Sequence, residues 1–378
     1  MQLKVANRTI DKFNNVSVSL KYDAVGSPFA FSLYFDPASA TDKRIFQPGS
    51  YNLVEVTHNG ETLITGVVLS QGFESSSVKH LTTVAGYSRT GVLEDCTIKT
   101  EQNPNMSNVS LAEIADLLVS PFGFKVVIDS NVSVVCDEVI ANSAINQYQT
   151  IGDYLSSIAS QKNVVLSHTP TGDLLLTKAN GNKTPIFHFS DKSTWVRMAL
   201  SFDGQQMHSI INVKGQVDAS NPNNSANETE LNPYLDNTRF GVGHGGFFPK
   251  FRPVVYQQTA STDVATQPLT ARKKLGNELK AIRLKIDIKG WTLNNKIPRP
   301  GDIVTVTNGE IFLYQKSKWF IEQVDFRGNE KEDVATIYCV LPECYNDDKI
   351  VNIFTGTNLT TPYVTPGAKA TIVPFDQP

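Results

Sequence analysis

The chain has 378 residues, of which 40% are hydrophobic and 19% are charged, and its formal net charge is −3. This apolar content supports folded cores and excludes a disordered chain, and the length predicts two to three domains. The slightly negative charge argues against a general attraction to nucleic-acid phosphates, and four cysteines are too few for a disulfide scaffold.

Residues 1–100 are predicted to form a first antiparallel β-barrel or sandwich. Apolar and polar residues alternate over 16–22 and again over 29–35, which is the period-two pattern of half-buried strands. Short strands at this spacing, with Gly and Pro between them, are typical of small antiparallel barrels and sandwiches. Further strand-like runs lie at 53–56, 63–69 and 80–86.

Residues 101–185 are predicted to form an α/β insertion. Ser110 and Glu113 have the spacing of a capping box before an apolar helical stripe, and Pro121 ends this helix. Thr150 begins a second helix in a similar way. Strands of this insertion are predicted at 125–128, 163–168 and 174–177, the last two as a hairpin.

Strands return in residues 186–217, and we expect them to complete the first barrel. Residues 218–253 are rich in Asn, Pro and Gly and predict a long loop. One helix is predicted over 269–284 and strands follow it, so 218–345 is interpreted as this loop plus a second β-barrel. Residues 346–378 contain four prolines and predict an extended C-terminal arm.

Two segments about 250 residues apart share one pattern. In the first, Pro48-Gly49 precede an apolar strand and then Asn59-Gly60. In the second, Pro300-Gly301 precede such a strand and then Asn308-Gly309. Both are interpreted as a turn, a strand, an Asn-Gly hairpin and a second strand, with chance recurrence of common turns as the alternative. Two related β modules in each chain of a trimer would place six similar modules in a ring.

The residues that could carry chemistry do not form a recognisable site. The cysteines lack metal-ligand spacing, and the histidines stand outside known catalytic motifs. Glu94 and Asp95 adjoin a strand end, but a glycosidase pair would have to be assembled from distant residues. We expect no catalytic residue, no cofactor and no metal. Neither a secretory signal nor an apolar run long enough for a transmembrane helix is visible, so synthesis in a reducing cytoplasm is expected.

A series of short motifs runs through residues 1–345 in a fixed order. They include Pro48, Gly49, Gly66, Gly86, Arg89, Asp95, Gly172, Gly215, Gln216, Pro300 and Gly301. Their order and spacing resemble the Mu-type phage baseplate central hub family, which is related to the hub part of type VI secretion spike proteins. The chain departs from the family pattern at Tyr87, where Arg is usual, and at Val92, where Asp is usual.

This resemblance implies a mainly β fold with an α/β insertion and two tube-protein-like antiparallel β-barrels per chain. It implies a homotrimeric baseplate hub that joins the sixfold tail tube to the threefold central spike of a contractile tail. DNA would pass through its lumen without specific binding. Other implied partners are the tail tube, central spike, baseplate wedge and tape measure proteins, within a virion baseplate assembled in the host cytoplasm. A β-rich glycan-binding or glycan-hydrolysing tail protein is the alternative.

Overall fold

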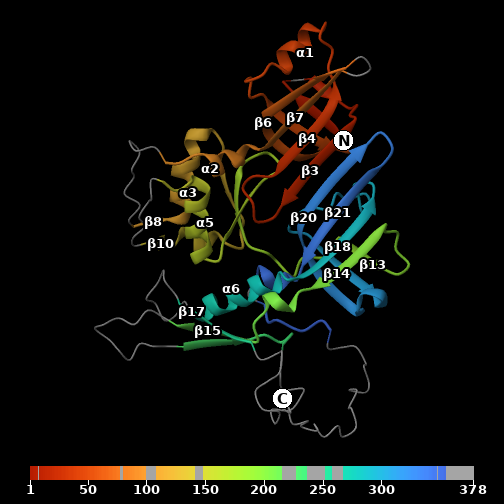
Figure 1. Cartoon of the computed structure of the whole chain (residues 1–378). Coiled ribbons are helices and arrows are strands. Elements are labelled where there is room, and N and C mark those ends of the chain that lie inside the picture. The colour runs from red at the N-terminus through yellow and green to blue at the C-terminus, as the bar shows by residue number, and fades with distance from the viewer. Residues whose placement is uncertain are drawn as a thin grey trace, which may run out of the picture.

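The computed structural model describes residues 1–6, 8–76, 80–98, 108–140, 148–214, 227–235, 252–257, 267–346 and 348–354. Strands dominate the fold, and the helices α2, α3 and α5 gather beside the sheet (Figure 1). Within these residues, thirteen strands belong to one large sheet and the others form three small sheets. The predicted class, mainly β with an α/β part, is confirmed.

The N-terminal β unit contains seven strands and the short helix α1. Alternation buries Val16, Val18 and Leu20 on one face, as the sequence predicts. The helix α1 (Ala40–Ile45) was not predicted; its cap is the side chain of Ser39, which accepts a hydrogen bond from the Asp42 amide. The strands are β1 (Gln2–Val5), β2 (Arg8–Ile10), β3 (Asn15–Lys21), β4 (Pro28–Tyr34), β5 (Leu53–His58), β6 (Glu61–Ser75) and β7 (His80–Ser88).

The helical unit follows and has a hydrophobic core of its own. The capping box of Ser110 and Glu113 is present, and the Thr150 hydroxyl caps the next long helix. The predicted hairpin is formed by β11 and β12 in antiparallel register. The elements are α2 (Val92–Asp95), β8 (Val109–Ser110), α3 (Leu111–Val119), β9 (Val126–Ile128), α4 (Ser133–Asp137), β10 (Val139–Ile140), α5 (Ile151–Gln161), β11 (Val165–His168) and β12 (Leu174–Thr177).

The C-terminal β unit contains six strands of the large sheet. They are β13 (Phe187–Ser190), β14 (Arg197–Phe202), β18 (Ile282–Lys289), β19 (Ile303–Asn308), β20 (Leu313–Asn329) and β21 (Asp333–Val340). A small separate sheet lies beside the helix α6 (Gln267–Leu279), as Figure 1 shows. It consists of β15 (Ile210–Lys214), β16 (Asn227–Leu231) and β17 (Pro253–Gln257).

Three expectations about this part of the chain need correction. Part of the loop predicted over 218–253 is a strand, because β16 pairs antiparallel with β15. Strands in 186–217 were expected to complete the first barrel, but β13 pairs with β19 and β14 pairs with β18. The edge of β3 is already occupied by β20, so it offers them no backbone partner. The helix predicted over 269–284 ends at Leu279, because apolar residues then alternate from Ile282 to Ile288 and form a buried strand.

The two β units share one strand order. Strands β3, β4, β5, β6 and β7 correspond to β14, β18, β19, β20 and β21. In both sets the first strand pairs with the second, the second with the fifth, the fifth with the fourth and the fourth with the third, always antiparallel. The modules suggested by the two Pro-Gly motifs are therefore a structural repeat.

The registers of the two units agree as well. The fourth strands both have a β-bulge, after Val68 in β6 and after Ile321 in β20. The amides of these two residues donate corresponding hydrogen bonds, to the Asn52 oxygen at 3.0 Å and to the Asp302 oxygen at 2.9 Å. Following the pairings, Leu200 corresponds to Val18, Phe202 to Leu20, Leu284 to Phe29, Trp319 to Gly66, Phe326 to Phe73 and Cys339 to Gly86.

The hairpin turns of the repeat differ from each other. Asn59 and Gly60 both have positive φ, 50° and 81°, as in a two-residue hairpin turn. Asn308 instead has φ −155° and begins a 3-10 turn that ends at Phe312, whose φ is 63°. The second Asn-Gly pair is therefore not the two-residue hairpin that the sequence predicted.

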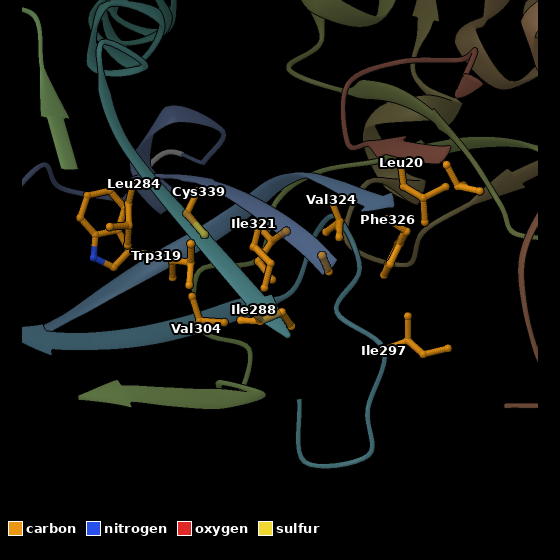
Figure 2. Packing of buried hydrophobic residues seen from close by; sticks show 14 of the residues in the cluster. Leu20, Leu284, Ile288, Ile297, Val304, Trp319, Ile321, Val324, Phe326 and Cys339 are labelled. Atoms are coloured by element: carbon orange, nitrogen blue, oxygen red, sulfur yellow. The ribbon is translucent and has the colours of Figure 1, made fainter. Parts of the chain in front are cut away.

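One strand pairing joins the two β units. The C-terminal half of β20 pairs with β3, from Gln323 opposite Lys21 to Asn329 opposite Asn15. Leu20 lies beside Val324 and Phe326 in Figure 2, and the hydrophobic core continues through both units. We call this pairing the intrachain junction.

Candidate functional site

Two glycines of the family motifs allow close packing within the N-terminal β unit. A Cβ at Gly86 would overlap the Val67 carbonyl oxygen and lie 2.9 Å from the Phe29 ring. A Cβ at Gly66 would meet the Tyr87 carbonyl oxygen and the same ring. The absence of both side chains therefore lets Phe29 lie across β7 and the bulged strand β6.

Arg89 brings together three motifs that are far apart in the sequence. Its guanidinium donates a hydrogen bond of 2.9 Å to the Gly123 oxygen and lies 5.9 Å from the centre of the Phe124 ring. Its aliphatic part passes so close to Gly172 that a Cβ there would be 2.9 Å from Arg89 Cδ. The φ of Gly172, 85°, also favours glycine. Arg89 thus links the end of β7 to two turns of the helical unit.

The departure from the family pattern at Tyr87 still has a partner. The Tyr87 hydroxyl donates a hydrogen bond to the Asp95 carboxylate, and its ring packs against Gly91. Burial first, and then this carboxylate, raise the pKa of the Tyr87 phenol. A neutral phenol therefore contacts Asp95 where the family usually places an arginine.

The two Pro-Gly motifs have similar backbones and different surroundings. Gly49 has φ 78° and open space around it, whereas Gly301 has φ 91° and lies against the Tyr22 ring. Next to Pro300, Arg299 donates hydrogen bonds to the Glu61 carboxylate at 3.2 Å and to the Thr62 oxygen at 2.9 Å. The start of the second β module therefore contacts the hairpin of the first. Pro48 lies in the exposed turn beside Gly49, and Gly215 and Gln216 lie outside the described residues.

Sequence reasoning missed a buried polar network where the helical unit meets the N-terminal β unit. His168 Nε2 lies 2.7 Å from the Ser27 hydroxyl, and the Ser27 amide donates to the Ser88 hydroxyl at 3.1 Å. Thr90 and Ser88 both donate to the Val25 oxygen. Ser27, Ser88 and Thr90 are completely buried, and burial lowers the pKa of His168. No sequence motif predicts this network, because its members come from three separate segments of the chain.

A second missed cluster ties β20 and the residues that follow β3 and α6 to the C-terminal segment. The Tyr345 hydroxyl lies 2.7 Å from the Asp23 carboxylate and 2.6 Å from that of Glu322, and Lys280 Nζ lies 3.1 Å from Asp23. Burial disfavours the Asp23 carboxylate, but the charge of Lys280 and the bond to Tyr345 outweigh it, so the pKa of Asp23 is lowered. The cluster is a structural contact in which each charged group is already paired.

Within the described ranges, no three His, Cys, Asp or Glu side chains gather as a metal site requires. In the same residues, no helix combines the length and the apolar character needed to cross a membrane. Glu94, considered above as a catalytic candidate, lies against Gly26, and burial raises the pKa of its carboxyl group.

Comparison with known proteins tests the resemblance. Residues 90–178, which form the helical unit with Arg89 at their border, match a family model described as the second domain of gp44-like baseplate hub proteins. The helical unit is similar to a baseplate hub domain. The resemblance predicted from the sequence is thus confirmed. No curated protein matches the chain.

Solved structures extend the likeness to the whole fold. The 43 kDa tail protein of prophage MuSo2 from Shewanella oneidensis is 20% identical, with a TM-score of 0.75 over 91% of this chain and 99% of that one. A tail protein from Neisseria meningitidis is 17% identical, with a TM-score of 0.72 over 91% and 98%. An Escherichia coli type VI secretion component is 11% identical, with a TM-score of 0.55 over 93% and 80%. The chain therefore has the fold of phage tail proteins.

Proposed function

We propose that this protein is the central baseplate hub of a contractile phage tail or tail-like particle. A homotrimer would join the sixfold tail tube to the threefold central spike and surround the DNA channel. The observation that carries this proposal is the repeat of one five-stranded order within one chain. Three such chains present six similar units, which can meet a sixfold ring while the assembly keeps threefold symmetry. The match of residues 90–178 to a baseplate hub domain supports the same role.

The proposed partners follow from this position in the tail. The tail tube protein and the central spike protein would bind opposite ends of the hub, with wedge and tape measure proteins as neighbours. DNA would pass without specific binding, in keeping with a net charge of −3, because a basic lumen would hold phosphates through counterion release. The proposed location is the virion baseplate after assembly in the host cytoplasm.

The proposed role is mechanical and uses no catalytic residue. Ser27, which contacts His168, is completely buried and offers no access to a substrate. A glycosidase acid needs a raised pKa, whereas the pKa of Asp23 is lowered within its cluster. Burial does raise the pKa of Glu94, but this carboxylate accepts a hydrogen bond from the Gly26 backbone, and we assign it a structural role in the hub.

The oligomeric state tests the proposal. Light scattering of the purified chain should give a trimer of 124.8 kDa from subunits of 41.6 kDa, and electron microscopy should show a ring with six similar lobes. A chain that stays monomeric at concentrations of roughly 100 μM, well above the dissociation constant of a stable complex, would contradict the proposal. Lysis of peptidoglycan in a zymogram would instead favour the hydrolase.

A further inference from the structure

In the described parts of the chain, the large sheet has uncovered strand edges at β6 and at β14, besides those of β2 and β13. After Val67, β6 pairs only with β7, so residues 70–74 leave one backbone edge open. At one end of the strand order, β14 pairs only with β18. Open edges expose backbone donors and acceptors that readily accept a further strand.

The internal repeat shows what each open edge corresponds to. The open half of β6 corresponds to the half of β20 that pairs with β3. The open edge of β14 corresponds to the edge of β3 that pairs with β20. The two open edges are therefore the counterparts of the two strands that already pair in the intrachain junction.

Burial differs sharply between the junction and its counterparts. In the junction, Phe326 is 0% exposed and Leu20 is 4% exposed. Their counterparts are Phe73 on β6, 46% exposed, and Phe202 on β14, 45% exposed. A large, half-exposed aromatic side chain on each open edge indicates that a further surface covers it.

The open edge of β14 also borders an apolar hollow of about 540 Å³. In the N-terminal unit the corresponding positions, Val18 and Leu20, are covered by Val324 and Phe326 of β20. The hollow therefore lies where a strand like β20 would place its apolar side chains. Its lining includes Leu200, Phe202, Tyr234, Ile311, Phe312 and Phe354.

We propose that β6 of one chain pairs antiparallel with β14 of a second copy, in the register of the intrachain junction. This register sets Gly72 opposite Ser201, Phe73 opposite Leu200 and Glu74 opposite Ala199. Glu74 then comes near two basic residues, because Arg197 lies on the same face of β14 and Lys285 lies beside Ala199 on β18. Asp287, which is opposite Arg197 and 3.9 Å from Lys285, offsets part of this positive charge. The contact is head-to-tail, and its closure into a ring of three rests on the proposed function.

Engineered disulfides test the register directly. The double variant Glu74→Cys with Ala199→Cys should form disulfides between chains under mild oxidation, and the covalent products should stop at three chains. In the positive control, Arg327→Cys with Ser17→Cys, the corresponding pair lies within one chain and should close without a change in mass. Glu74→Cys with Leu200→Cys is the off-register control, because the two side chains would point to opposite faces.

The outcomes separate this inference from the proposed function. A trimer that forms no crosslink at 74 and 199, while the positive control closes, would overturn the edge pairing and leave the hub proposal standing. A covalent ladder that continues beyond three chains would support the pairing and contradict the closed trimer. Equal crosslinking of the off-register pair would overturn the proposed register.

A single substitution gives an independent readout. Phe73→Glu should abolish the trimer and yield a folded monomer of 41.6 kDa with a nearly unchanged melting temperature, because Phe73 is half-exposed in the single chain. Val134→Glu is the matched control, since Val134 is an exposed apolar residue of the helical unit, away from both edges. A folded Phe73→Glu variant that remains trimeric would overturn the proposal.

Discussion

The two β units share five strands in one order and one register, yet they fill their interiors with different side chains. In the N-terminal unit, Phe29 lies across Gly66 and Gly86. At the corresponding positions, the C-terminal unit has Leu284, Trp319 and Cys339, all buried, and Figure 2 shows them in the same part of its core. A large ring over two glycines is thus replaced by a smaller residue over a tryptophan and a cysteine.

The two units therefore keep the same strand order and register although the sizes of their core side chains differ. A core accepts different hydrophobic residues when the total volume is similar, whereas strand order and bulge position depend on backbone pairing. The connections between the strands differ more between the two units than the core side chains do. Helix α1 lies between the second and third strands of the first unit, whereas the small sheet and α6 lie between the first and second strands of the other unit.

The largest expected effect distinguishes the covered edge from the open one. Phe326→Ala should lower the free energy of unfolding by about 3–5 kcal/mol, because Phe326 is completely buried in the intrachain junction. Phe73→Ala, at the corresponding open position, should cost below about 1 kcal/mol in dilute monomer. Urea unfolding of both variants measures the difference. Equal costs would show that the two edges are equally covered in the single chain.

A smaller effect distinguishes the two cores. Gly86→Ala should destabilise the fold by about 1–3 kcal/mol, because the new methyl group would overlap the Val67 carbonyl oxygen. Cys339→Ala, at the corresponding position, only shortens a buried side chain and should cost about 1 kcal/mol. Thermal unfolding compares them. A harmless Gly86→Ala would show that β6 and β7 can separate locally.

The smallest expected effect is a pH dependence of the free energy of unfolding. It arises from His168, which lies in the N-terminal half of the chain. Burial lowers the pKa of His168, so the unfolded chain binds its proton more readily than the folded chain does. Stability should therefore be full above about pH 6.5, the ordinary histidine pKa, and fall as the pH decreases below it. His168→Asn should reduce this slope between pH 7 and pH 5, as measured by urea unfolding. An unchanged slope would assign the pH dependence to other groups.

Local patterns account for what the sequence determined about this protein. Alternating residues predicted β3 and β4, and the caps at Ser110 and Thr150 predicted α3 and α5, because these signals act over a few neighbouring residues. Two Pro-Gly motifs predicted the β repeat. The ordered motifs, read as a family resemblance, predicted the type of protein, and the match of the helical unit to a baseplate hub domain agrees.

Only the tertiary structure decided how these pieces combine. Periodicity cannot state that β14 joins β18 or that β3 joins β20, since pairing depends on which edges the folded chain leaves open. The contact of Arg89 with Gly123 and that of His168 with Ser27 likewise join distant segments. The open edges at Phe73 and Phe202 became recognisable only when two registers could be compared, because exposure and strand pairing are properties of the whole sheet.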